Sequence, residues 1–262
     1  MEFIEQLPKL NGLSIIDTHI HYDDDMYAND VDLLLEKVHQ YGVSRIITSG
    51  TGNITNKKAV ELAEKYDYVY ATVGLHPELI DDNSQINIEQ YLKHPKVVAV
   101  GEIGLDYHYR DDNKDVQKAL FEQQIELAIK YNMPIVVHDR DAHNDTMQIL
   151  NKYKPKGTVH CYSGSVEMAR EIVKLGMFLG IGGVVTFKNA RKTVEVVEQI
   201  PLDNIVLETD GPYLAPPPYR GKRNHSAFIS LVAQRIAEIK KTSIKQVLDV
   251  TSQNAINLYN LK

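Results

Sequence analysis

Eight short, nearly continuous apolar runs recur along the chain, and they constrain its fold more than any other feature. Strands that are covered by helices on both faces have this composition, because neither face meets water. Such burial is typical of parallel sheets. The runs occupy residues 13–17, 43–48, 68–74, 97–104, 134–138, 157–162, 177–182 and 204–209.

Amphipathic helical patterns separate these runs, and the clearest spans residues 115–132. Eight strands, each followed by a helix, with no linker or low-complexity break, predict an α/β fold: a single (β/α)8 TIM barrel over residues 1–262. Residues 243–261 predict an extra C-terminal helix that covers the barrel, and residues 1–12 form an N-terminal extension. An open, doubly wound sheet is the alternative, but no Gly-x-Gly-x-x-Gly follows the first strand.

The composition is that of an ordinary soluble globular protein. Of the 262 residues, 43% are hydrophobic and 24% are charged, and the formal net charge is -6. An acidic protein has no overall positive field with which to hold long duplex nucleic acid. Cys161 is the one cysteine, and the N-terminal segment lacks the pattern of a signal peptide. Because no apolar run is long enough to span a membrane, we expect a cytoplasmic protein without membrane contact.

Polar residues fall where the strands of the predicted barrel end. A (β/α)8 barrel carries its chemistry at the carboxyl ends of its strands. His19 and His21 are two residues apart on an extended chain, so both imidazoles project from the same face. The polar residues at these strand ends are His19, His21, His76, Glu102, Asp106, His138, His160 and Asp210. Each has an ordinary structural explanation when taken singly, but separate burial of six such groups without partners would cost several kcal/mol each, whereas a shared metal site satisfies them together.

Six motifs, in order along the chain, resemble the TatD-type metal-dependent deoxyribonuclease family, which belongs to the amidohydrolase-like barrels. They read DTHIH, GLHP, VGEIGLDY, VVHDRDA, HCYSG and ETDGPYLAPPPYRGKRN. The resemblance implies a hydrolase of DNA phosphodiesters with two divalent metal ions. The ligands that it implies are His19, His21, Glu102, His138, His160 and Asp210. Two features depart from the family pattern: residues 1–12 precede the first strand, and His225-Ser226 replaces the usual Glu-Pro.

Two metal ions at such a site can flank a scissile phosphate and activate a water molecule. Glu102, which is central in the order of the strands, is the candidate for a bridging carboxylate, and Asp210 is expected to act also as the general base. Imidazole and carboxylate ligands suit Zn²⁺, Mn²⁺, Co²⁺ or Ni²⁺, and Mg²⁺ is compatible if water fills some positions. The expected ligands are His19, His21 and Asp210 for one ion, and His138 and His160 for the other.

Further residues are candidates for substrate contacts. His76, in the GLHP motif, is expected to contact substrate or to support a ligand, and a structural cap on its turn is the alternative. Four cations either bind phosphates that flank the scissile bond or are solvated charges of an acidic protein. These cations are Arg140, Arg220, Lys222 and Arg223.

Aromatic residues also follow the ligand strands. Tyr162, together with Tyr107 and Tyr213, either stacks on bases of a single strand or packs at the rim. Cys161 is expected on a strand next to His160, with its side chain on the opposite face and away from the metals.

The leading hypothesis is a metal-dependent deoxyribonuclease that acts on short single-stranded DNA ends, by resemblance a 3′-5′ exonuclease, without an obligatory protein partner. Hydrolysis of an amide, ester or lactone by the same site is the alternative enzymatic function, and the cations that follow Asp210 favour phosphodiesters. A non-catalytic metal-binding barrel is the third hypothesis. Structural zinc sites are closed and four-coordinate, which fits six candidate ligands at an open barrel mouth poorly.

Overall fold

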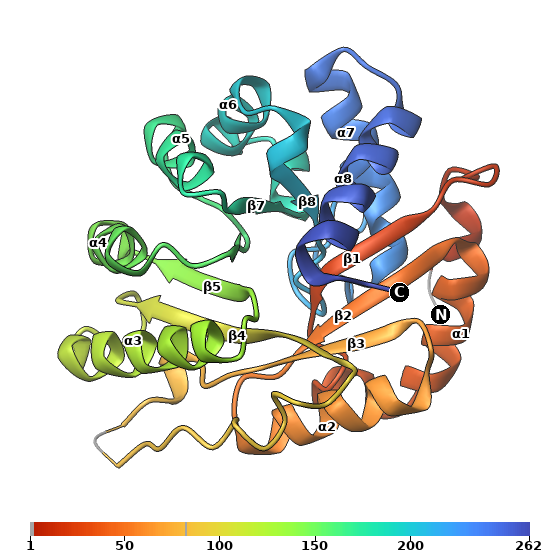
Figure 1. The fold of residues 1–262 in the computed structure, drawn as a ribbon. Helices are drawn as coiled ribbons and strands as arrows, with labels where there is room; N and C mark the ends of the chain where they lie inside the picture. Colours follow the sequence, from red (N-terminus) through yellow and green to blue (C-terminus); the bar gives the residue numbers. More distant parts are fainter. Residues whose placement is uncertain (1–2, 82) are drawn as a thin grey trace.

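Eight parallel strands form a nearly closed barrel in the computed structural model, which describes residues 3–81 and 83–262 (Figure 1). Each strand pairs in parallel with the next one along the chain, in the order β1-β2-β3-β4-β5-β6-β7-β8. All eight predicted strands are present, so the (β/α)8 prediction is confirmed. Their bounds are β1 Ile15–Ile20, β2 Val43–Ser49, β3 Val69–Val73, β4 Val97–Asp106, β5 Ile135–Arg140, β6 Gly157–Val159, β7 Phe178–Ile181 and β8 Ile205–Leu207.

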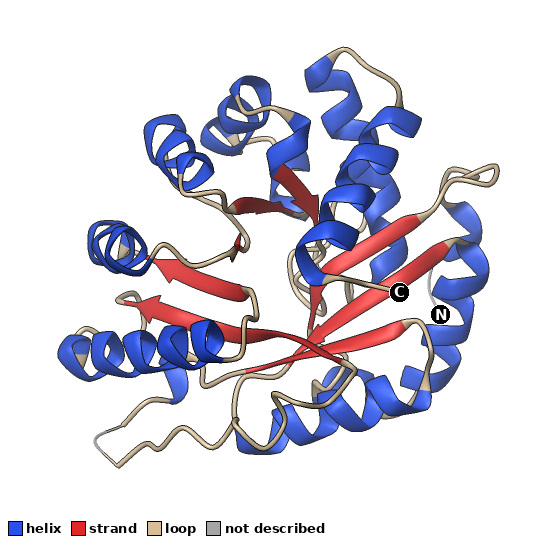
Figure 2. Ribbon diagram, in the orientation of Figure 1, coloured by secondary structure: helices blue, strands red, loops and turns tan. Residues whose placement is uncertain are grey.

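Helices surround the strands on the outside of the barrel (Figure 2). The α-helices are α1 Val31–Tyr41, α2 Asn53–Lys65, α3 Lys114–Lys130, α4 His143–Tyr153, α5 Val166–Lys174, α6 Arg191–Gln199, α7 Ile229–Lys240 and α8 Ile244–Tyr259. Short 3-10 helices are η1 Ile4–Gln6, η2 Asp25–Tyr27, η3 Pro77–Leu79, η4 Gly183–Thr186, η5 Leu202–Asn204 and η6 Ser226–Phe228. Among the described residues, no helix has both the length and the apolar composition needed to cross a membrane.

One connection differs from the predicted alternation. Between β3 and β4, the described residues 74–81 and 83–96 contain the 3-10 helix η3 and no α-helix. The segment is rich in Pro, Asp and Asn, which favour turns over helix interiors. The prediction of a helix after every strand is therefore wrong at this connection, while both α7 and α8 follow β8.

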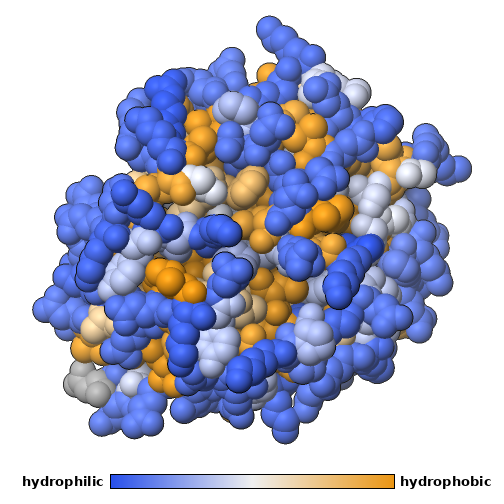
Figure 3. All heavy atoms as spheres, viewed as in Figure 1, coloured by the Kyte–Doolittle hydropathy of each residue, from blue (hydrophilic) through white to orange (hydrophobic). Residues whose placement is uncertain are grey.

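Helix α8 covers the amino-terminal end of the barrel, as predicted. Tyr259 of α8 and Leu261 just after it pack against apolar residues near the strand starts, among them Ile16, Val136 and Val206. A hollow of about 1040 Å³ opens at the same end. Figure 3 shows apolar side chains near the middle of the face that carries the C-terminus, with polar side chains around them. The candidate ligands lie at the opposite, carboxyl end of the strands.

The seam between β1 and β8 is closed by buried polar contacts. The backbone N–H of Asp210 donates to the carbonyl of His19 at 3.0 Å. The Asp17 carboxylate, which is fully buried, accepts hydrogen bonds from the Thr209 hydroxyl at 2.7 Å and from the Thr209 backbone N–H at 3.1 Å. Burial raises the pKa of Asp17 to about 7. These contacts hold β1 beside the segment that carries Asp210.

The described part of the N-terminal extension packs on the barrel. Leu7 and Leu10 are buried and belong to the main hydrophobic core. The ring of Phe3 lies 4.7 Å from the ring of Tyr219, measured between centroids. Residues 1–2 of the predicted extension lie outside the described residues. The extension thus adds to the core of the barrel.

We expect Thr209→Val to lower the free energy of unfolding by about 1–3 kcal/mol, because a buried oxygen of Asp17 loses its hydroxyl donor. Urea denaturation followed by circular dichroism measures the change. Thr251→Val in α8 is a matched control, since the buried Thr251 hydroxyl donates only to a carbonyl of its own helix, that of Val247. Equal stabilities of Thr209→Val and the unsubstituted protein would contradict this account of the seam.

Candidate metal centre

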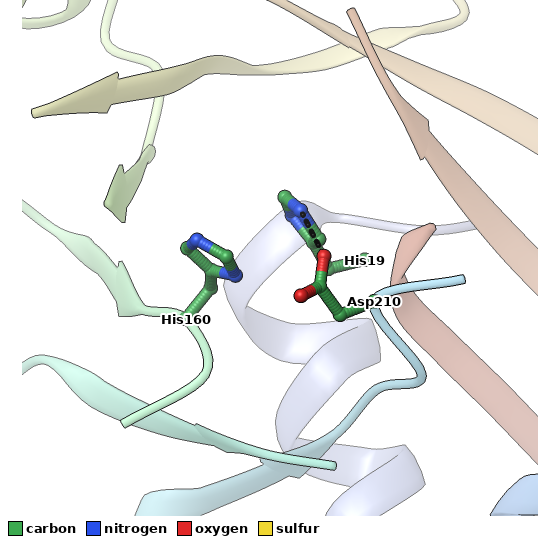
Figure 4. A group of neighbouring side chains, drawn as sticks. All are labelled: His19, His160 and Asp210. Carbon is green, nitrogen blue, oxygen red and sulfur yellow. Dashed lines mark ion pairs between the residues drawn. The ribbon is translucent and has the colours of Figure 1, made fainter. Parts of the chain in front are cut away.

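The six predicted ligands meet at the carboxyl end of the barrel, although they come from five different strands or strand ends. Glu102 and His19 are buried within β4 and β1, and His138 lies in β5. Figure 4 shows His19, His160 and Asp210 directed toward one another from separate segments of the chain. One ligand atom from each of these three lies within 4.8 Å of the other two.

The first group of donor atoms forms around the two histidines of the DTHIH motif. The Nε2 atoms of His19 and His21 are 3.2 Å apart. Oε2 of Glu102 lies 3.3 Å from Nε2 of His19 and 3.4 Å from that of His21. Oδ1 of Asp210 lies 3.7 Å and 3.6 Å from the same two nitrogens. Two imidazoles and two carboxylates therefore converge on one point.

The second group forms around the other oxygen of Glu102. Oε1 lies 2.8 Å from Nδ1 of His138 and 2.7 Å from Nε2 of His160. The two histidine nitrogens are 3.3 Å apart. Each oxygen of the Glu102 carboxylate thus faces a different pair of histidines, which is the arrangement that a bridging ligand requires.

Hydrogen bonds on the far side of three of the four histidine rings, those of His19, His21 and His138, orient the other ring nitrogen toward the centre. Nδ1 of His21 is 2.7 Å from the carbonyl of Ser49, so in the neutral ring this nitrogen carries the proton and Nε2 faces the centre as the acceptor. Nε2 of His138 is 2.9 Å from Oδ2 of Asp106, which leaves Nδ1 to face Glu102. Nδ1 of His19 lies 3.1 Å from the hydroxyl of Ser49. The donor set therefore fits divalent metal ions of the imidazole- and carboxylate-binding type.

His76 has the opposite arrangement. Its Nδ1 accepts a hydrogen bond from the backbone N–H of Glu78 at 3.2 Å. This contact caps η3, which is the structural alternative that the sequence offered for His76. A neutral ring then carries its proton on Nε2, which lies 3.3 Å from Oε1 of Glu102. His76 is therefore a hydrogen-bond donor at the edge of the site, in keeping with a supporting or substrate-contacting role.

The buried charges of the site depend on one another. Burial alone would raise the pKa of the Glu102 carboxyl group, but the surrounding histidines, led by His160, hold it well below its usual range. Burial lowers the pKa of His19 to about 4. Burial also opposes a charge on His138, yet the Asp106 and Glu102 carboxylates raise the pKa of His138 to about 10. His138 must lose this proton to become a ligand, so metal binding at this site competes with protons.

Three supporting residues received no role in the sequence interpretation. Asp106 was visible at the end of the fourth strand, but its contact with His138 depends on the register of β4 and β5. Nothing in the sequence indicated that Ser49 supports the ligands, because serine is common at strand ends. Glu208 is buried, and burial raises its pKa to about 8. Its Oε1 accepts the backbone N–H of Cys161 at 2.5 Å, directly after His160.

The predicted position of Cys161 is wrong. Strand β6 ends at Val159, and Cys161 has a left-handed backbone with φ of 44° instead of a strand conformation. The hydrogen bond from its N–H to Glu208 holds this turn. The expected alternation of His160 and Cys161 on a strand therefore does not apply.

The predicted phosphate-binding cations have different surroundings. Arg223 makes two contacts of 2.7 Å with the Asp30 carboxylate and donates to the carbonyl of Met26, so it ties its loop to the β1–α1 connection. The Arg220 guanidinium lies 3.8 Å from the centroid of the Phe187 ring. Arg140, Arg220 and Lys222 are exposed. The geometry gives Arg223 a structural role and leaves the other cations accessible.

Tyr162, His225 and Ser226 are buried and contact other residues of the protein. Tyr162 is 3% exposed, and its hydroxyl donates to the carbonyl of Ser165 at 2.6 Å, so its ring offers no face to a base. The substrate role predicted for Tyr162 is therefore not supported. His225 is buried and stacks on Phe228 at 4.0 Å between centroids, and the Ser226 hydroxyl lies 3.0 Å from that of Tyr22. The departure from the Glu-Pro pattern thus places two buried residues in the packing behind the loop.

Comparisons with known proteins agree with this geometry. The sequence profile of the family described as TatD related DNase matches residues 16–260. The chain is 41% identical to the uncharacterized metal-dependent hydrolase YabD of Bacillus subtilis (strain 168), over 94% of this chain and 99% of that protein. It is 33% identical to the uncharacterized metal-dependent hydrolase TatD of Mycobacterium tuberculosis, over 94% and 98% of the two chains.

A solved structure shows the same likeness in three dimensions. The crystal structure of YjjV, a TatD homologue from Escherichia coli K12, superimposes with a TM-score of 0.87 at 32% sequence identity. The match covers 95% of this chain and 98% of that one. Agreement in sequence and fold over nearly the whole length leads to one conclusion: this chain belongs to the TatD family of metal-dependent hydrolases.

Proposed function

We propose that this protein hydrolyses phosphodiester bonds of DNA and acts as a 3′-5′ exonuclease on short single-stranded ends. The observation that carries the proposal is the Glu102 carboxylate, whose two oxygens each face a separate pair of histidines. Membership of a family described as TatD related DNase supports DNA as the substrate. The net charge of -6 favours short ends over long duplex.

The cofactor proposed is a pair of divalent ions, of which Zn²⁺, Mn²⁺, Co²⁺ and Ni²⁺ suit the donors best and Mg²⁺ is compatible. When bound, such a pair polarises a phosphoryl oxygen and lowers the pKa of a water molecule. Glu102 would contribute to both positions. The remaining ligands would be His19, His21 and Asp210 on one side, and His138 and His160 on the other.

Side chains of this protein supply the rest of the chemistry. Asp210 is partly exposed at the mouth, and we assign to it the acceptance of a proton from the attacking water. His76 would donate its Nε2 proton to a phosphate oxygen of the substrate. Arg140, Arg220 and Lys222 would attract the phosphates that flank the scissile bond.

Cellular location and partners remain predictions from the sequence. We propose a cytoplasmic enzyme, because Cys161 is the one cysteine and fits a reducing compartment. DNA is the proposed macromolecular partner, and no obligatory protein partner is invoked.

We expect the native protein to bind two divalent ions per chain. Glu102→Ala should retain at most one, because both groups of histidines lose their shared carboxylate. His76→Ala should retain two, since His76 faces the site as a donor and not as a ligand. Elemental analysis by plasma mass spectrometry after exhaustive dialysis measures the content. Two ions in Glu102→Ala, or one in His76→Ala, would contradict this assignment.

We expect the chelated protein to regain cleavage of single-stranded DNA when Mn²⁺, Zn²⁺ or Mg²⁺ is restored. A 5′-labelled oligonucleotide should give a ladder, and a 3′-labelled one should release labelled mononucleotide first. Asp210→Asn should reduce the rate by about 10²–10⁴-fold, because it removes the proton acceptor. Arg235→Ala, in an exposed pair with Glu238 on α7, is the control and should cleave normally. Turnover of an amide or lactone in place of DNA would favour the alternative substrate class.

A further inference from the structure

An exposed tyrosine stands beside the candidate metal centre with a cation against its ring. The Tyr109 side chain is 60% exposed, although it is large and aromatic. The Arg140 guanidinium lies over this ring, 4.7 Å from its centroid. The edge of the ring meets His108 at 5.1 Å between centroids. Arginine against one aromatic face, with the residue otherwise open to solvent, is an arrangement that suits stacking of a planar partner.

A single carboxylate connects this tyrosine with the metal centre. Oδ2 of Asp106 is 2.9 Å from Nε2 of the candidate ligand His138. Oδ1 of the same carboxylate accepts the backbone N–H groups of His108 at 2.9 Å and of Tyr109 at 3.0 Å. Asp106 is buried, and its own N–H donates to Gln117. The turn that carries Tyr109 is therefore fixed relative to the ligand by a rigid, buried contact.

Arg140 is placed by the same strand as the ligand. It follows His138 by two residues in β5, so the two side chains project from the same side of the strand, about 7 Å apart along it. The residue between them, Asp139, points the other way and pairs with His143 of α4 at 2.8 Å. Arg140 therefore carries its charge from the strand of the ligand His138 to the ring of Tyr109.

We propose that Tyr109, backed by Arg140, is the platform on which the unpaired base next to the cleaved bond stacks. This inference rests on the proposed function, and it names the side chain that receives the base beside the cleaved bond. Bases in the interior of a duplex are stacked on both faces and cannot lie on such a platform, whereas single-strand binding depends on aromatic side chains.

The charges around the platform suit a nucleotide. Two nearby acidic groups have partners, since Asp141 lies 2.9 Å from Nδ1 of His108 and Asp112 pairs with Arg110 at 3.2 Å. Arg140 then adds a positive charge beside the ring. Tyr213, which is 56% exposed, differs in this respect, because its hydroxyl lies 3.5 Å from the Asp24 carboxylate. Tyr109 therefore has a cation against its ring, whereas Tyr213 has a carboxylate beside its hydroxyl.

Equilibrium binding of a fluorescein-labelled single-stranded oligonucleotide, measured by anisotropy in the Asp210→Asn background with Mn²⁺, tests the platform. The second probe is the same oligonucleotide with abasic residues at its two 3′-terminal positions. Tyr109→Ala should raise the Kd for the complete oligonucleotide about 5- to 150-fold, the range expected for one stacked base, and should change the Kd for the abasic one little. Tyr109→Phe should keep the affinity. Tyr131→Ala, at the far end of α3, is the matched control and should change neither value.

The possible results separate the platform from the proposed function. Equal effects of Tyr109→Ala on both oligonucleotides, or no effect on either, would overturn the platform. If the unsubstituted enzyme also cleaves DNA, the proposed nuclease then stands without it. Base-dependent binding by a protein that cleaves no DNA would support the platform and contradict the exonuclease.

Discussion

The Glu102 carboxylate, shared between two pairs of histidines, is the interaction on which the rest of the centre depends. It is buried in the fourth strand, near the middle of the strand order, so its two oxygens can face ligands from both halves of the barrel. The histidines keep it ionised in spite of its burial, because they hold its pKa well below the usual range. A buried carboxylate with partners on both sides is stable only when positive charge is close by. Because Glu102 is already ionised, its carboxylate can bind metal ions without first losing a proton.

Contacts behind the ligands fix the orientation of the histidine rings in the centre. Ser49 of β2 contacts the Nδ1 atoms of both His19 and His21, and Asp106 orients His138. Each contact selects the ring nitrogen that is left for a metal ion. Asp106 also holds the turn of Tyr109, so the ligand and the proposed base platform share one anchor. The geometry at the mouth is therefore determined by residues that never reach the substrate.

The two ends of the barrel have different tasks. The amino-terminal end carries apolar side chains that pack against α8, and the carboxyl end carries the candidate ligands. Closure of the barrel links the two, because the Asp17–Thr209 contacts hold β1 against the segment that carries Asp210. Without this seam, Asp210 would not meet the histidines of β1. Stability of the barrel and assembly of the centre therefore depend on the same polar contacts.

The sequence by itself determined the eight strands and the polar residues at their ends, because apolar runs and strand-end histidines follow from local pattern and parallel strands end at one mouth. The choice of six candidate ligands among those residues came from motifs that resemble the TatD family. It did not reveal the missing helix after β3, the turn at Cys161, the burial of Tyr162 or the pairing of Arg223 with Asp30. These features depend on contacts between residues far apart in the chain. Only the tertiary structure could decide which oxygen of Glu102 faces which histidines and which loop cations are already engaged, since such contacts arise when the barrel closes.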